Sequence, residues 1–125
     1  MDSIWSSGSL IQDEQGIWRN RTLPKAVSYP VAGSEITFEL EDKSFWYQHR
    51  NRIIETVIER FPYAGFKTRP FLDVGGGNGV VSAHLQSLGH NAVVVEPGAT
   101  GAGNARRRGV RTVVNALYQE VSWLD

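Results

Sequence analysis

The sequence predicts an α/β fold built on a parallel sheet, and three observations support this prediction. From residue 70 onward, short apolar segments alternate with segments of helical pattern. The stretch "FLDVGGGNG" at residues 71–79 places four glycines directly after the first apolar segment. Apolar residues make up 41% of the chain and charged residues 21%, as in an ordinary globular domain. Strands and helices in alternation are typical of parallel strands joined by right-handed crossovers.

Residues 1–40 are expected to form an N-terminal segment with short elements. The stretch "SLIQDEQGIW" (9–18) predicts two short strands around a turn at Gly16. Two prolines and a glycine in "LPKAVSYPVAGS" (23–34) predict a loop. Apolar and polar residues alternate along "EITFEL" (35–40), which predicts a half-buried strand. The apolar face of that strand would consist of Ile36, Phe38 and Leu40.

A long helix is predicted at the start of the second unit, which spans residues 41–125. Its sequence is "EDKSFWYQHRNRIIETVIERF", with Asp42 or Ser44 available to cap its N-terminus and Pro62 to end it. One face carries large side chains at helical spacing, and we expect this face to pack against the rest of the protein. It consists of Trp46, Arg50, Ile53, Val57 and Phe61, with Ile54 and Ile58 beside it.

Three strands and two further helices are predicted after this helix. The strands are expected at residues 70–74, 91–96 and 110–115, and the helices at residues 79–89 and 99–109. The strands are short apolar runs, which is typical of strands buried on both faces of a parallel sheet. The first of these helices presents Val81, Leu85 and Leu88 on one face and ends at Gly89. Two internal glycines weaken the second by about 1 kcal/mol each.

The glycine-rich stretch follows the first buried strand, at the end of the sheet where such folds bind ligands. Gly75 permits a sharp turn, Gly77 removes a side chain where a ligand would pass, and Gly79 lets the helix begin close to the strand. Glu96 ends the second strand, so it is expected to face the same crevice as Asp73. Its carboxylate can accept hydrogen bonds from both hydroxyls of a ribose. The simpler alternative is a tight turn beside a solvated glutamate.

The spacing of the glycines separates two kinds of nucleoside site. The dinucleotide pattern G-x-G-x-x-G or A places the large Val80 at its third position when it starts at Gly75. Started at Gly77, it places Ser82 there, but the loop then comes two residues late relative to the strand. The pattern acid-x-G-x-G-x-G fits residues 73–79 without adjustment.

The stretches "FLDVGGGNG" and "VVVEPG" together resemble the first two motifs of the class I S-adenosylmethionine-dependent methyltransferases. The helix "FWYQHRNRIIETVIERFP" also resembles the one that precedes the first motif in a bacterial branch of that class. The resemblance covers roughly residues 41–118. It implies a Rossmann-like sheet, S-adenosyl-L-methionine as cofactor, and transfer of its methyl group to an acceptor.

The resemblance also implies roles for individual residues. Asp73 would orient the methionine amino group, Glu96 would hold the ribose hydroxyls, and Pro97 would lie against the adenine ring. Residues 115–117 would border the adenine edge, although they depart from the commoner acid-containing pattern. The other cofactor-binding residues implied at matching positions are Gly75, Gly76, Gly77, Asn78 and Gly79 in the first motif, and Asn115 and Leu117 after the third strand.

The remaining charged residues and the histidines give weaker indications of a binding role. Arg50 and His49 on the long helix could reach the cofactor carboxylate, and the alternative is a solvated charge on a helix face. The three arginines at 106–108 are expected on the outer face of their helix. His49, His84 and His90 share no metal-ligand spacing, so no metal site is predicted.

Charge and composition limit the kinds of partner that we expect for the protein. Thirteen basic residues balance thirteen acidic residues, so we expect no nucleic-acid partner. The chain has no cysteine, which excludes disulfides and thiolate metal sites. It shows no run of about 20 apolar residues and no signal peptide, so we expect a cytoplasmic protein without a membrane partner.

The sequence stops shortly after the third predicted strand, so we expect a truncated methyltransferase that is inactive by itself. The first of the three strands would then keep an open edge. In a natural short protein, the strand predicted at residues 35–40 would cover that edge; otherwise the chain would self-associate through it. Two other functions stay open: a non-catalytic nucleotide- or S-adenosylmethionine-binding module, and half of an NAD-dependent oxidoreductase.

Overall fold

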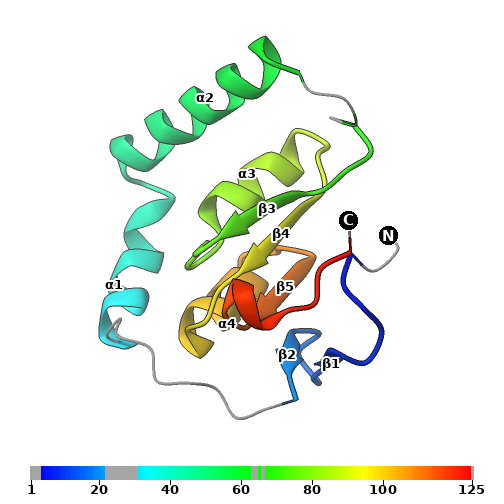
Figure 1. The fold of residues 1–125 in the computed structure, drawn as a ribbon. Helices are drawn as coiled ribbons and strands as arrows, with labels where there is room; N and C mark the ends of the chain where they lie inside the picture. Colours follow the sequence, from blue (N-terminus) through cyan, green and yellow to red (C-terminus); the bar gives the residue numbers. More distant parts are fainter. Residues whose placement is uncertain (1–3, 22–30, 63–64, 66, 125) are drawn as a thin grey trace.

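The computed structural model describes residues 4–21, 31–62, 65 and 67–124 (Figure 1). The strands are β1 (Leu10–Gln12), β2 (Trp18–Asn20), β3 (Phe71–Val74), β4 (Ala92–Val95) and β5 (Thr112–Asn115). The α-helices are α1 (Val31–Glu41), α2 (Phe45–Arg60), α3 (Val80–Ser87) and α4 (Ala99–Arg107), and a short 3-10 helix spans Tyr118–Glu120. The described residues thus form an α/β fold compatible with a Rossmann-like arrangement.

The five strands form one mostly parallel sheet with the order β1-β2-β5-β4-β3. The predicted alternation of strands and helices after residue 70 is confirmed, and β3, β4 and β5 are parallel to one another. The hairpin predicted around Gly16 is also confirmed: β1 and β2 are antiparallel, and β2 extends the sheet by pairing in parallel with β5. The N-terminal segment therefore adds to the edge of the sheet that lies opposite β3.

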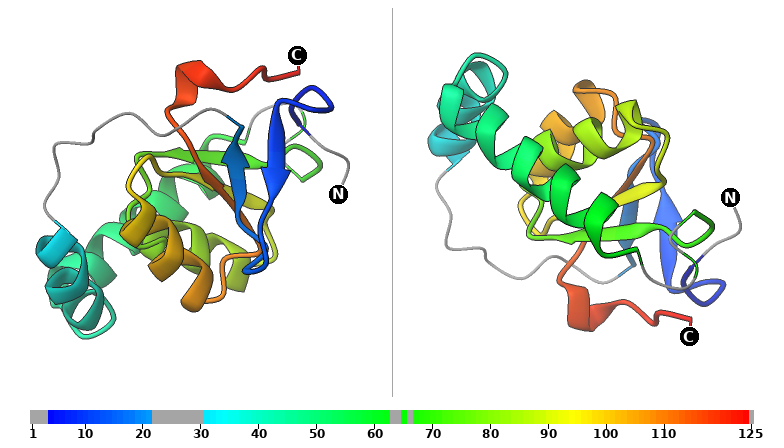
Figure 2. Two further views of the ribbon diagram at one scale, coloured as in Figure 1. Left: turned by 90° about the horizontal axis from the view of Figure 1, so that it is seen from below. Right: turned by 90° about the horizontal axis from the view of Figure 1, so that it is seen from above.

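The two faces of the sheet are covered by different parts of the chain. Helix α4 covers one face, where Val94 and Val113 pack against Ala102 and Ala105. On the other face, side chains from both chain ends pack over β4 and β5. Figure 2 shows the two chain-end segments on the side of the sheet away from α4. That second cluster contains Trp5, Leu10, Val93, Val95, Val114, Ala116 and Val121, with Ile4, Trp18 and Trp123 packed against it.

The prediction of a strand at residues 35–40 is wrong, because these residues belong to α1. In the helix, Ile36 and Leu40 lie one turn apart and both are exposed. The Phe38 ring instead contacts the side chains of Arg107 and Arg108, at the end of α4 and just after it. An alternation of three apolar residues is too short to exclude a helix. Of the loop predicted at residues 23–34, the last four residues are helical, and residues 23–30 lie outside the described part.

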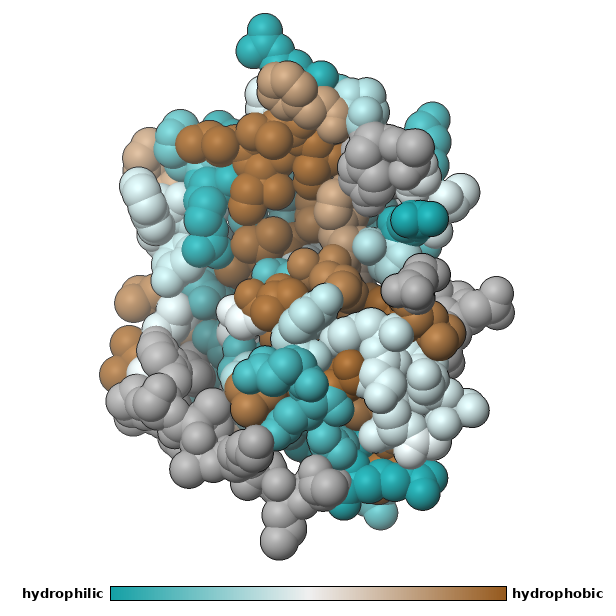
Figure 3. Space-filling view, in the orientation of Figure 1, coloured by the Kyte–Doolittle hydropathy of each residue, from teal (hydrophilic) through white to brown (hydrophobic). Residues whose placement is uncertain are grey.

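Helix α2 confirms the predicted long helix, but its predicted packing face is wrong. Ser44 is at the N-cap position without a side-chain capping hydrogen bond. Trp46 is 66% exposed, and Ile53 and Val57 are about half exposed. The helix turns its polar Asn51 inward instead. Apolar side chains are therefore visible on the molecular surface in the part of Figure 3 where α2 and β3 lie.

Strand β3 was predicted to be buried, and this prediction is wrong. Among the described residues it pairs with β4 alone and forms one edge of the sheet. Leu72 and Val74 face the side that α3 and α4 do not cover, and both are exposed. The predicted cover from residues 35–40 is absent, because α1 lies beside α4 instead. No helix in the described part of the chain is long and apolar enough to cross a membrane.

Candidate functional site: a pocket beyond β3 and β4

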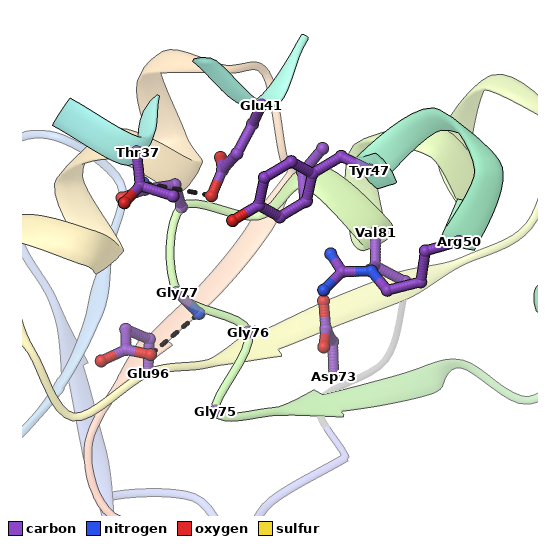
Figure 4. Close-up of a pocket in the computed structure, with 12 residues that line it drawn as sticks. Thr37, Glu41, Tyr47, Arg50, Asp73, Gly75, Gly76, Gly77, Val81 and Glu96 are labelled. Carbon is purple, nitrogen blue, oxygen red and sulfur yellow. Dashed lines mark hydrogen bonds between the residues drawn. The ribbon is translucent and has the colours of Figure 1, made fainter. Parts of the chain in front are cut away.

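A pocket of about 380 Å³ opens where β3 and β4 end (Figure 4). This volume lies within the range of small-molecule sites, roughly 300–1,000 Å³. One wall comes from the β3–α3 loop and the end of β4, and the opposite wall comes from α1 and α2. The pocket is lined by Thr37, Glu41, Tyr47, Arg50, Asp73, Gly75, Gly76, Gly77, Asn78, Val80, Val81 and Glu96.

The β3–α3 loop, residues 75–79, has a backbone that favours glycine. Gly75, Gly77 and Gly79 have φ angles of 73°, 52° and 75°, in the left-handed region. At Gly76, an added Cβ would lie 2.9 Å from the Asp73 carboxyl carbon, so a side chain there would displace that group. At Gly77, an added Cβ would meet nothing within 4 Å, so the missing side chain leaves free space at the pocket wall.

Gly79 permits a close approach, but not the one predicted. An added Cβ would lie 2.8 Å from Ala105 Cβ and 2.8 Å from Val110 Cγ2. These atoms belong to α4 and to the segment that leads into β5. Gly79 therefore lets α3 begin against the end of α4, rather than against β3.

Glu96 follows β4, and its carboxylate is fixed by two backbone groups. Gly77 N–H donates to Oε2 at 2.8 Å, and Gly98 N–H donates to Oε1 at 2.7 Å. Gly101 on α4 makes room for this side chain, since an added Cβ there would lie 3.1 Å from Glu96 Cγ. Each carboxylate oxygen has a second lone pair available for a ligand.

Asp73 lies on the same side of the pocket as the loop, one residue before the end of β3. Its Oδ2 accepts a hydrogen bond from the Ser82 hydroxyl at 2.9 Å. Burial raises the pKa of the Asp73 carboxyl above its ordinary 3.8, and the bonds from Ser82 and the charge of Arg50 oppose this rise. A half-buried carboxylate that is costly to ionise is a feature of sites that bind or act on charged groups.

Arg50 extends from α2 across the pocket toward Asp73, as Figure 4 shows. Its guanidinium carbon lies 4.9 Å from the centre of the Tyr47 ring. Its Nε is buried and has no hydrogen-bond partner among the described residues. Arg50 is therefore a partly buried residue that lines the pocket, which favours the prediction that it could reach a ligand. His49 is instead exposed, stacks on Phe45 and is not among the residues that line the pocket.

Several residues expected at the site do not line the pocket: Gly79, Pro97, Asn115 and Leu117. Asn115 Nδ2 donates to the carbonyl oxygens of Glu96 and Pro97, at 2.9 and 3.0 Å. Its Oδ1 accepts a hydrogen bond from Arg19 on β2. Asn115 therefore fixes the turn after β4, and it supports the position of Glu96 from behind.

Sequence reasoning missed the wall formed by α1 and α2. Thr37 was missed because it lay in the segment predicted to be a strand. Glu41 was missed because it lay at the start of the predicted long helix, with no pocket expected beside it. Tyr47 lies three residues before Arg50, so the helical spacing of these two side chains was a usable signal. Gly101 could also have been noticed in the sequence, because a glycine inside a helix lowers helix stability and therefore indicates a close contact.

The three arginines at residues 106–108 were predicted to share an outer helix face, and this prediction is wrong for one of them. Arg107 is exposed, with 58% of its side chain accessible to solvent. The Arg108 side chain is only 7% exposed and is directed toward α1. A helix turns by about 100° per residue, so three consecutive side chains cannot all point outward.

No protein-family model and no curated protein sequence matches this chain. Within the described residues, no group of three or more histidine, aspartate or glutamate side chains is placed to hold a metal ion.

Proposed function

We propose that this chain is the S-adenosylmethionine-binding part of a methyltransferase, acting on an acceptor of a kind yet to be identified. One observation carries the proposal: Asp73, the glycine loop and Glu96 converge on one pocket beyond the carboxyl ends of adjacent parallel strands. This is the place where open α/β sheets bind nucleotide-containing ligands. The transfer activity itself rests on the resemblance of the two sequence motifs.

The residues in the pocket fit the chemistry of this cofactor. The ribose hydroxyls need an acceptor, and the fixed carboxylate of Glu96 supplies it. The amino acid end carries one positive and one negative group, and Asp73 and Arg50 offer opposite charges on neighbouring sides of the pocket. An ammonium group beside Asp73 would offset the cost that burial imposes on its carboxylate.

When bound, S-adenosylmethionine supplies a methyl group on a positively charged sulfur. The residues of the pocket would act by holding and orienting the ligand and by excluding water. The wall from α1 and α2 would contribute to that exclusion, since Tyr47 and Thr37 lie across the pocket from the glycine loop.

Calorimetric titration of the chain with S-adenosylmethionine, S-adenosylhomocysteine and NAD tests this proposal. We expect binding of the first two ligands and none of NAD, because Val80 occupies the position that the dinucleotide pattern reserves for a small residue. Binding of NAD alone would support an oxidoreductase instead. Binding without methyl transfer by the complete protein to any acceptor would indicate a non-catalytic binding module.

A further inference from the structure

Arg108 directly follows α4 and joins three separate parts of the chain. One terminal nitrogen donates to Glu41 Oε2 on α1 at 2.5 Å and to the backbone carbonyl of Asn78 in the glycine loop at 2.9 Å. The other donates to the carbonyl oxygen of Phe38 at 2.9 Å. The guanidinium carbon also lies 4.4 Å from the centre of the Phe38 ring. Arg108 is thus the junction of α4, α1 and the glycine loop.

Asn78 is held by the same buried polar cluster. Its Nδ2 donates to Glu41 Oε1 at 3.4 Å, and its Oδ1 accepts from Asn104 Nδ2 at 3.0 Å. Asn78 is 4% exposed and Glu41 is 6% exposed. Without Arg108, the buried Glu41 carboxylate would have lost its ion-pair partner, which is costly. Without Glu41, Arg108 would keep only the exposed Asp42, whose Oδ1 lies 3.5 Å from its Nε.

A loop of glycines needs such external contacts because glycine allows many backbone conformations. The Asn78 carbonyl belongs to the same peptide group as Gly79 N–H, which donates to the Gly76 carbonyl at 2.9 Å. Arg108 therefore fixes the plane of that peptide group from one side. A second contact holds the loop two residues earlier, where Gly77 N–H donates to the carboxylate of Glu96.

We infer that Arg108 and Glu41 are positioning residues for the pocket. Their buried pair fixes the conformation of the glycine loop and holds α1 in place as the opposite wall. The consequence for ligand affinity rests on the proposed function, whereas the consequence for the loop does not. A single arginine thereby couples the wall that α1 provides to the loop that carries the ligand-facing backbone.

Arg108→Lys is the variant that tests this inference, because it keeps the positive charge and removes the fixed, branched geometry of the guanidinium. Arg107→Lys is the matched control. Arg107 is the preceding residue and also contacts α1, through Glu35 at 3.7 Å, but it is exposed. The measurement is amide hydrogen exchange of the free protein by NMR, at Gly77 and Gly79 in the loop.

In Arg108→Lys we expect exchange at Gly77 and Gly79 to be about tenfold faster or more, with β4 amides such as that of Val94 little changed. The control should leave both regions unchanged. Unchanged loop exchange would overturn the inference, and so would an equal increase in the loop and in β4, because this would mean a general loss of stability. If Arg108→Lys does not fold, Glu41→Gln keeps an acceptor for Arg108, and the same criteria apply to it.

Titration with S-adenosylhomocysteine completes the test. We expect Arg108→Lys to weaken binding about tenfold, a change of about 1.4 kcal/mol, and Arg107→Lys to leave it unchanged. Equal affinities of the wild type and Arg108→Lys would overturn the role of the pair in ligand binding. A wild-type protein that binds no S-adenosylhomocysteine would instead contradict the proposed function, and the exchange result would still decide whether Arg108 positions the loop.

Discussion

The strands of the sheet and the first two helices are held in place by different forces. The fully buried side chains of β4 and β5 include Val93, Val94, Val113 and Val114. Helices α1 and α2 leave large apolar side chains exposed, although Ile54 and Ile58 of α2 are half-buried, and ion pairs link both helices to the rest of the protein. Arg108 and Glu41 join α1 to the end of α4, and His84 and Glu55 join α2 to α3 at 3.1 Å.

This difference teaches which part of the pocket is robust and which part depends on a few contacts. Apolar burial is non-directional and roughly proportional to area, so many residues share it. Hydrogen bonds and ion pairs depend on the placement of both partners. The wall formed by the glycine loop and Glu96 rests on the apolar sheet, whereas the wall formed by α1 and α2 rests on polar pairs.

The largest effect is expected at the glycine that packs α3 against α4. Gly79→Ala should lower the free energy of unfolding by about 3–5 kcal/mol, because it combines a left-handed φ with a Cβ placed 2.8 Å from two neighbouring atoms. Gly89→Ala, at the other end of the same helix, has a similar φ and no close neighbour, and should cost about 1–2 kcal/mol. Denaturant unfolding measures both. Equal losses would mean that the close packing at Gly79 contributes nothing.

A matched pair of valines tests the comparison directly. Val94→Ala in β4 should cost about 2–3 kcal/mol, because it removes two fully buried carbon atoms and leaves a cavity. Val57→Ala on α2 should change the free energy of unfolding by less than about 0.5 kcal/mol, since that side chain is 51% exposed. A large loss at Val57 would show that the outer face of α2 is covered in solution, and would break the comparison.

The same difference explains what the sequence could predict. The strands at β4 and β5 and the glycine turn were predictable because burial and left-handed φ angles each restrict residue type locally. The burial of Arg108 could not be predicted in this way, because it depends on contacts with Glu41 and the Phe38 carbonyl, which are distant in sequence. The strand prediction for residues 35–40 failed because three alternating apolar residues do not exclude a helix, and these residues form part of α1, which lies beside α4.

Ligand affinity should fall when a residue of the glycine-loop wall is changed, and should stay the same when an exposed arginine outside the pocket is changed. Glu96→Ala should weaken binding of S-adenosylhomocysteine by roughly 1.5–3 kcal/mol for each charged hydrogen bond lost to the ligand. It also removes the acceptor for Gly77 N–H, which adds to the loss. Arg107→Ala removes an exposed side chain outside the pocket lining and should have little effect. Calorimetric titration of the two variants gives the comparison, and equal losses would point to a different ligand geometry.

The raised pKa of Asp73 predicts a smaller effect that depends on pH. Between the ordinary pKa of 3.8 and the raised pKa, the folded protein binds more protons at Asp73 than the unfolded chain does. This group therefore contributes stability at low pH that is lost as the pH rises through the raised pKa. Denaturant unfolding of the wild type and Asp73→Asn, from about pH 4 to about pH 8, isolates that contribution. A constant difference between them would contradict the pKa shift.

The smallest effect is expected at the open edge of the sheet. Strand β3 pairs only with β4 among the described residues, and its side chains Leu72 and Val74 are exposed on this edge strand. Such an edge tends to pair with another strand. We therefore expect weak, concentration-dependent self-association, measurable by light scattering, and we expect Leu72→Lys to reduce it because a lysine on an edge strand disfavours pairing.

Leu88→Lys provides the control for this last comparison. Leu88 is 40% exposed, close to the 37% of Leu72, but it lies at the end of α3 and not on a strand. If β3 is the contact, only Leu72→Lys lowers the association, because only there does the new charge meet an incoming strand. Equal reductions would attribute the association to general apolar exposure, of which α2 offers more than β3. A wild-type chain that stays monomeric at all concentrations would show that β3 recruits no partner strand.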